Sequence, residues 1–177
     1  AYKRIRETEL IALFTGLNGG TSLGAAAAAF SAANVTAVIS VAKTGRYGDD
    51  LAIIHHPNAV MRLARDLTTI GSGQIRPLPE GYSARMMTRA WKGLQVWDVP
   101  VFETANITRD ASDDSIGVIM NKEALGFLES LAPSQEKERD ASLRAWELNM
   151  VTDMAAFELD DLHGAPLTYD AVNPATS

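Results

Sequence analysis

The stretch LAIIHHPNAVMRLARDL, residues 51–67, places a buried strand directly before a helix. Leu51 to His55 form a short apolar run that ends before Pro57, which is typical of a strand. Proline suits the first turn of a helix, and the apolar residues after it recur at helical spacing through about Leu67. The sequence therefore predicts a strand, a tight turn and a helix, which together indicate mixed α and β content.

Two further helices are predicted on the N-terminal side of this unit. Residues 2–17 have apolar side chains close to helical spacing, and Asn18-Gly19-Gly20 ends the pattern because these residues readily take the left-handed conformation. Ser31 is a suitable N-cap for a helix from Ala32 to Ala42, with Gly45 just past its end. We expect a loop between the two helices.

Strands are predicted further along the chain. Gly71 to Tyr82 is rich in Gly and Pro and is expected to be a long loop. Leu94 to Val101 alternates like one half-buried strand, and a second strand, Gly117 to Met120, follows the polar, hairpin-like stretch 106–115. The spacing of apolar residues in Leu143 to Leu159 fits both a helix and a strand. We favour a long strand there because every second position from residue 146 to 154 is Trp, Leu, Met or Thr.

The composition is that of a folded protein and excludes several kinds of chemistry. The 177 residues fit one domain of ordinary size, and 46% of them are hydrophobic. With no cysteine, disulfides, thiolate metal sites and cysteine nucleophiles are excluded. No apolar run approaches the roughly 18 residues that span a bilayer. The net charge of -6 disfavours tight binding of nucleic acid, which needs clustered Lys and Arg.

The pair His55-His56 is the strongest candidate for a catalytic or metal site. Imidazole binds metals, and strand ends host catalytic loops in open α/β sheets. Adjacent residues of a strand point to opposite faces, however, so the two rings cannot easily share one metal ion. The remaining histidine, His163, has no metal-ligand spacing to the pair. Structural roles are favoured, and a small metal- or phosphate-dependent α/β enzyme using His55 and His56 stays open as an alternative.

Other site patterns fail on their chemistry. The glycines between Gly16 and Gly24 are not preceded by a strand or followed by Gly-Lys-Ser/Thr. The paired aspartates at 49–50, 113–114 and 160–161 lack the alternating oxygen ligands of a calcium loop. No Gly-x-Ser-x-Gly motif occurs. We therefore expect no cofactor, no metal and no catalytic residue.

Arginines gather in the middle of an otherwise acidic chain. Their segregation suits a charge-complementary contact between copies of one subunit as well as it suits an anionic ligand. The candidate subunit-contact residues are Arg62, Arg65, Arg76, Arg85 and Arg89.

Three colinear stretches resemble the major capsid proteins of tailed bacteriophages. They are VFETANI (101–107), IGVIMNKEALG (116–126) and ERDASLRA (138–145). IALFTGL (11–17) and IHHP (54–57) also look like this family, in the same order and at similar separations. The resemblance covers the chain from about residue 9 to about residue 171.

The resemblance implies the α+β Hong Kong 97-type capsid fold, with an axial domain and a peripheral domain. Residues 1–17 would end the spine helix of the peripheral domain, and 18–124 would form the axial domain. Residues 125–177 would supply peripheral-domain strands and a C-terminal return strand. The family also has an N-terminal arm and an extended loop before the spine helix, for which this sequence has no counterpart. We therefore expect the 177 residues to be an incomplete chain.

The function implied by the resemblance is structural. A major capsid protein would assemble into pentamers and hexamers of an icosahedral shell around double-stranded DNA, in the host cytoplasm, and would become part of the virion. Its partners would be other copies of itself, portal, scaffold or decoration proteins, and packaged DNA only loosely, with no membrane. An encapsulin-like compartment shell would share the fold and is a second alternative.

Overall fold

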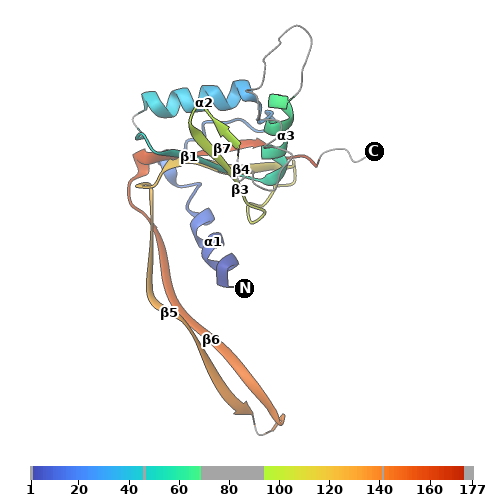
Figure 1. Ribbon diagram of the computed structural model, residues 1–177, viewed down its shortest axis with the longest axis vertical. Helices are drawn as coiled ribbons and strands as arrows, with labels where there is room; N and C mark the ends of the chain where they lie inside the picture. The colour runs from blue at the N-terminus through green and yellow to red at the C-terminus, as the bar shows by residue number, and fades with distance from the viewer. Residues whose placement is uncertain (1, 46, 69–93, 141, 174–177) are drawn as a thin grey trace.

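The computed structural model describes residues 2–45, 47–68, 94–140 and 142–173. They form a body built on a five-stranded sheet, from which a long two-stranded arm projects (Figure 1). The α+β content expected from the sequence is confirmed. No described helix is long and apolar enough to cross a membrane.

The sheet of the body has the order β2-β3-β1-β4-β7. β1 runs parallel to β3, and the other neighbouring pairs are antiparallel. The longest pairing joins β4 to β7, from Asp114 opposite Asp170 to Met120 opposite Gly164. The strands are β1 (Leu51–His55), β2 (Leu94–Val96), β3 (Val99–Glu103), β4 (Asp114–Asn121) and β7 (Gly164–Asp170).

Two helices, α2 (Ala32–Thr44) and α3 (Pro57–Thr68), pack on one face of this sheet. The Ser31 hydroxyl accepts a hydrogen bond from the backbone N–H of Asn34, as expected of an N-cap. Both predicted helices and the strand between them are confirmed, with α2 two residues longer than predicted. The main core lies between helices and sheet and includes Phe30, Val35, Ile39, Ile53, Leu63, Val101, Ile119 and Leu167.

The opposite face of the sheet is covered by the N-terminal segment. α1 (Tyr2–Ala12) ends five residues before the predicted Leu17, and the 3-10 helix η1 (Leu17–Gly20) follows a turn. The chain turns early because Phe14 and Leu17 are buried against this second face. Asn18 takes a left-handed φ of 55° within η1.

One sequence prediction about β3 is wrong. The single strand expected over Leu94–Val101 is a hairpin of β2 and β3, turned at Trp97 and Asp98, which have φ of 50° and 63°. The hairpin-like character predicted for 106–115 is present locally, where Arg109 bridges antiparallel to Ser115 and the backbone N–H of Asp110 donates to the carbonyl oxygen of Asp114, although β1 lies between β3 and β4. The stretch crosses the sheet and enters β4 at Asp114.

The arm consists of β5 (Leu125–Asp140) and β6 (Ala145–Glu158), paired antiparallel. The long strand predicted over Leu143–Leu159 is confirmed by β6. The 3-10 helix η2 (Asp161–His163) then leads into β7, which returns to the body. The predicted division at residues 17 and 124 into axial and peripheral domains stays a prediction.

Candidate assembly surface

His55 lies in the core of the body. Its ring stacks on Phe30 with 4.8 Å between centroids, and its Nε2 lies 3.2 Å from the carbonyl oxygen of Leu167. Nδ1 accepts a hydrogen bond from the backbone N–H of His56, so Nε2 carries the proton. Burial lowers the pKa of His55 to about 4, which keeps the ring neutral near pH 7.

Gly117 makes room for this imidazole. It lies opposite His55 on β4, and a Cβ at residue 117 would stand 2.3 Å from Cδ2 of His55 and 2.5 Å from the backbone oxygen of Ile54. The glycine of the IGVIM stretch is therefore required by packing.

His56 points to a different environment at the start of α3. Its Nδ1 accepts a hydrogen bond of 3.2 Å from the backbone N–H of Asn58, and burial together with the nearby Arg109 lowers the pKa of His56. His163 lies in η2, with Nδ1 3.1 Å from the Asp160 carboxylate. Among the described residues, no group of three His, Asp or Glu side chains is arranged to hold a metal ion. The contacts of His55 and His56 are those of packing and helix capping.

Of the five candidate contact arginines, the structure describes Arg62 and Arg65, both on α3. The Arg62 guanidinium forms an ion pair with Asp170 of β7 in the same chain, while its side chain stays 48% exposed. Arg76, Arg85 and Arg89, like the loop Gly71–Tyr82, lie outside the described residues. A role for these arginines between subunits stays a prediction.

α1 joins the arm to the body. The Tyr2 hydroxyl donates a 2.8 Å hydrogen bond to Oε1 of Glu129, and the Arg6 guanidinium lies 4.5 Å from the centre of the Phe127 ring. On its other side, Glu7 accepts hydrogen bonds from the hydroxyl of Thr104 and from Nδ2 of Asn106. The Thr-x-Asn turn therefore holds α1 against the sheet, and α1 in turn contacts the base of the arm.

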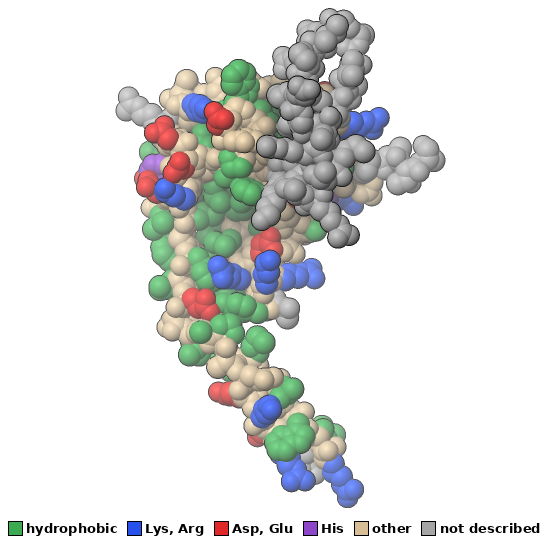
Figure 2. Space-filling view, viewed as in Figure 1, with side chains coloured by type: hydrophobic (Ala, Val, Ile, Leu, Met, Phe, Trp, Pro, Cys, Tyr) green, Lys and Arg blue, Asp and Glu red, His purple; other side chains and the backbone are tan. Residues whose placement is uncertain are grey.

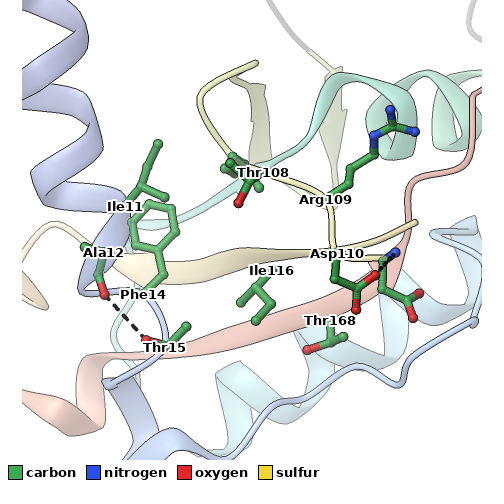
Figure 3. Close-up of a pocket in the computed structure, with 11 residues that line it drawn as sticks. Ile11, Ala12, Phe14, Thr15, Thr108, Arg109, Asp110, Ile116 and Thr168 are labelled. Carbon is green, nitrogen blue, oxygen red and sulfur yellow. Dashed lines mark hydrogen bonds between the residues drawn. The ribbon is translucent and has the colours of Figure 1, made fainter. Parts of the chain in front are cut away.

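A cleft of about 330 Å³ lies where α1 ends, beside β4 and β7 (Figure 3). Ile116 is 39% exposed on its lining. Two of the charged groups around it already have partners: Asp110 accepts from the backbone N–H groups of Ser112 and Asp114, and Arg109 pairs with Asp113. The cleft is suited to an apolar side chain better than to a charged ligand.

The arm is the largest exposed feature of the described structure. Its apolar side chains are exposed along both strands, with hydrophobic and charged groups alternating toward the tip (Figure 2). An isolated two-stranded ribbon is only marginally stable in water. The arm therefore needs additional cover, which makes it the candidate functional surface. Its exposed apolar residues are Leu128, Leu131, Trp146, Leu148, Met150, Val151 and Phe157.

Comparison with known proteins gives the fold. No protein-family model matches the sequence, and no curated protein matches it either. Among solved structures, the SrpI encapsulin complex of Synechococcus elongatus matches with a TM-score of 0.68 and 12% identity, covering 99% of this chain and 64% of that one. The chain has the Hong Kong 97-type capsid fold.

Two phage structures agree. A chain of Mycobacterium phage Che8 matches with a TM-score of 0.60 and 13% identity, over 96% of this chain and 57% of that one. The mature capsid of bacteriophage PhiM1 matches with a TM-score of 0.54 and 14% identity, over 97% and 61%. The fold implied by the sequence resemblance is confirmed, and the chain spans less than two thirds of each of these relatives.

Sequence reasoning placed the candidate contacts on the arginines and missed the arm as a surface. The sequence held a signal for this surface in β6, where large apolar side chains alternate with polar ones. The described residues leave most of these apolar side chains exposed.

Proposed function

We propose that this chain is a structural subunit of a closed shell, the major capsid protein of a tailed bacteriophage, which forms pentamers and hexamers around double-stranded DNA. The observation that carries the proposal is the exposed β5–β6 arm on a body with the fold of capsid and encapsulin chains. In this role the chain acts by binding copies of itself and performs no catalysis.

The arm's length supports a contact between subunits. Its 16-residue strand extends roughly 50 Å at about 3.3 Å per residue, much further than a body of this size needs for its own core. Contacts between different surfaces of neighbouring copies generate rings when the rotation closes, as pentamers and hexamers require. The arginines Arg62, Arg65, Arg76, Arg85 and Arg89 are proposed as further contacts between copies.

The net charge of the chain supports only loose contact with packaged DNA. A chain of net charge -6 binds packaged DNA weakly, because tight binding depends on release of counterions by clustered cations. The proposal includes portal, scaffold or decoration proteins as further partners, assembly in the host cytoplasm and a final place in the virion.

An encapsulin-like compartment is the second candidate, favoured by the TM-score of 0.68 to the Synechococcus elongatus complex. The two functions share a shell and differ in what it encloses. The same purified particles therefore decide between them.

The test is to purify particles of the whole natural polypeptide from its source and to measure their mass and their nuclease-protected contents. Particles of several megadaltons with protected double-stranded DNA are expected for a phage capsid. Particles of that mass with protein cargo and no protected DNA would support the compartment. Single subunits at all concentrations would contradict both.

A further inference from the structure

The turn between β2 and β3 holds a large apolar side chain in solvent. Trp97 is 71% exposed, and Trp97 and Asp98 both have left-handed φ, of 50° and 63°. A bulky residue such as Trp rarely adopts this conformation, because its Cβ crowds the backbone. A strained turn that leaves an indole exposed indicates a role outside the fold of the single subunit.

Trp97 and Asp98 together offer two kinds of contact. Tryptophan is enriched among the residues that contribute most to protein interfaces, because the indole combines a large apolar area with one N–H donor. The Asp98 carboxylate adds a negative charge next to it. A matching surface therefore needs an apolar hollow with a cation at its edge.

The cleft at the end of α1 has both features (Figure 3). Ile11, Phe14 and Ile116 supply apolar lining, and Ile116 is exposed. Among the described lining residues, Arg109 is the cation. The cleft lies where α1 enters the body, whereas Tyr2, at the other end of α1, contacts the arm.

The charged groups of the cleft favour an incoming carboxylate at Arg109. Its Nη1 donates to Asp113 at 2.8 Å and to the backbone oxygen of Ala171 at 3.5 Å, and a guanidinium carries five N–H donors in all. The carboxylates of Asp110 and Asp114 accept hydrogen bonds from backbone N–H groups of the same copy, and Asp114 is only 5% exposed. These bonds offset part of their negative charge, so Arg109 can pair with one more carboxylate.

The turn and the cleft lie at opposite ends of the sheet. β3 runs parallel to β1 and begins at Val99, so the turn stands at the end where β1 begins. Ile116 lies near the start of the antiparallel β4, at the other end. Between Ile116 and Asn121, which pairs with Leu51, β4 spans roughly 17 Å at about 3.4 Å per residue. The indole of one copy is therefore out of reach of the cleft in the same copy.

We propose that Trp97 of one copy inserts into the cleft of the next, against Ile116, with Asp98 pairing with Arg109; this rests on the proposed shell function. Each copy then gives one indole and receives one. The contact joins two different surfaces, so it is heterologous and closes into rings when the rotation fits. The apolar insertion supplies the buried area, and the Asp98–Arg109 pair fixes its direction.

Disulfide trapping in shells of the whole natural polypeptide tests this contact. The 177 residues contain no cysteine, and Thr108 is an exposed residue on the lining of the cleft, next to Arg109. Asp98→Cys/Thr108→Cys keeps Trp97 and Ile116 in place. After mild oxidation and dissolution in detergent without reductant, it is expected to run as a ladder of linked copies. Each single variant, Asp98→Cys or Thr108→Cys, is the matched control and should run like the natural chain.

Shell yield measures what the indole contributes. Trp97→Ala is expected to lower the yield on the order of tenfold, because a buried indole is lost from the contact. Its unassembled subunit should melt at the same or a higher temperature, since Trp97 is exposed there. Trp97→Phe, which keeps an apolar ring, should give an intermediate yield. Val41→Ala, at another exposed apolar residue, should leave the yield unchanged.

Three results would overturn the insertion. Intact shells of the double cysteine variant that dissolve into single copies are one, and linkage in the Asp98→Cys control equal to that of the double variant is another. A third is unchanged shell yield in Trp97→Ala. If the natural chain forms no shells, the proposed function itself fails and the contact fails with it, a result that no cysteine or Trp97 variant is needed to recognise.

Discussion

The Glu7 carboxylate of α1 accepts a hydrogen bond of 2.6 Å from Nδ2 of Asn106, 99 positions further along the chain. The hydroxyl of Thr104 donates to the same carboxylate. Both donors stand in the turn that follows β3, so one side chain joins the helix at the base of the arm to the sheet of the body.

Replacing Glu7 by Ala should loosen this junction. Two hydrogen bonds to a half-buried carboxylate are lost, which we expect to lower the free energy of unfolding by about 1.5 to 3 kcal/mol. Urea denaturation of the unassembled subunit measures the change. Glu9→Ala on the exposed side of α1 is the matched control and should change little. Equal effects of the two changes would mean that the Thr104 and Asn106 contacts do not hold α1.

Gly117→Ala should be more damaging than an ordinary glycine replacement in a strand. The new methyl group would stand 2.5 Å from the backbone oxygen of Ile54 and against the ring of His55, neither of which has room to move. We expect a loss of about 1 to 3 kcal/mol of unfolding free energy, measured by thermal melting. Gly16→Ala should be tolerated, because its Cβ would stand 3.3 Å from the flexible Glu158 carboxylate and at an ordinary contact distance of 3.5 Å from the backbone oxygen of Leu13.

His55 should make the subunit less stable in mild acid. Its folded pKa of about 4 lies below the value near 6.5 of an unfolded histidine, so the unfolded chain binds the proton first as the pH falls. The contribution of neutral His55 to the unfolding free energy is fully present above pH 6.5 and is lost progressively toward pH 4, by about 3 kcal/mol in total. The measurement is urea denaturation across this pH range.

The control for that profile is His55→Gln. In this variant, unfolding should take up nearly one proton fewer in mild acid, so the unfolding free energy should change less with pH. The smaller contribution of His56, whose pKa is also lowered, should remain. An unchanged slope would mean that His55 is not the buried neutral group described here.

The turn between β2 and β3 offers a stabilising change. Trp97 and Asp98 both have positive φ, as in the turns that favour Asn-Gly, and the Trp97 side chain is 71% exposed. Trp97→Asn/Asp98→Gly should raise the unfolding free energy by about 0.5 to 1 kcal/mol, because Asn and Gly adopt the left-handed conformation at a lower cost. A loss of stability on thermal melting would show that the exposed indole has a packing role.

The same turn shows why part of the fold escaped sequence reasoning. Trp97-Asp98 contains neither Gly nor Asn, so Leu94 to Val101 looks like one continuous strand. In contrast, residues 51–67 were predictable because local patterning and tertiary burial agree there: Leu51, Ile53 and Leu63 are buried where the sequence is apolar.

The arm was harder to predict than the body. β6 alternates and was predicted as a strand, but β5 contains Pro133 and the charged segment Gln135 to Arg139 and is exposed from Leu128 onward. A strand without a buried face has no hydrophobic pattern in its sequence, because its position is set by pairing with its partner strand. The surface of the arm was missed for the same reason, because it is made of β5 and β6 residues that are far apart in the sequence and come together only when the two strands pair.

The central claim is that this chain builds a shell through its arm, and electron microscopy of the whole natural polypeptide tests it most directly. The comparison is with a variant in which Trp146, Leu148 and Met150 are all replaced by Ser, and thermal melting of the unassembled variant checks that it still folds. We expect closed icosahedral particles from the natural chain and dispersed, folded subunits from the variant. Single subunits from the natural chain, or equally good shells from both, would contradict the account.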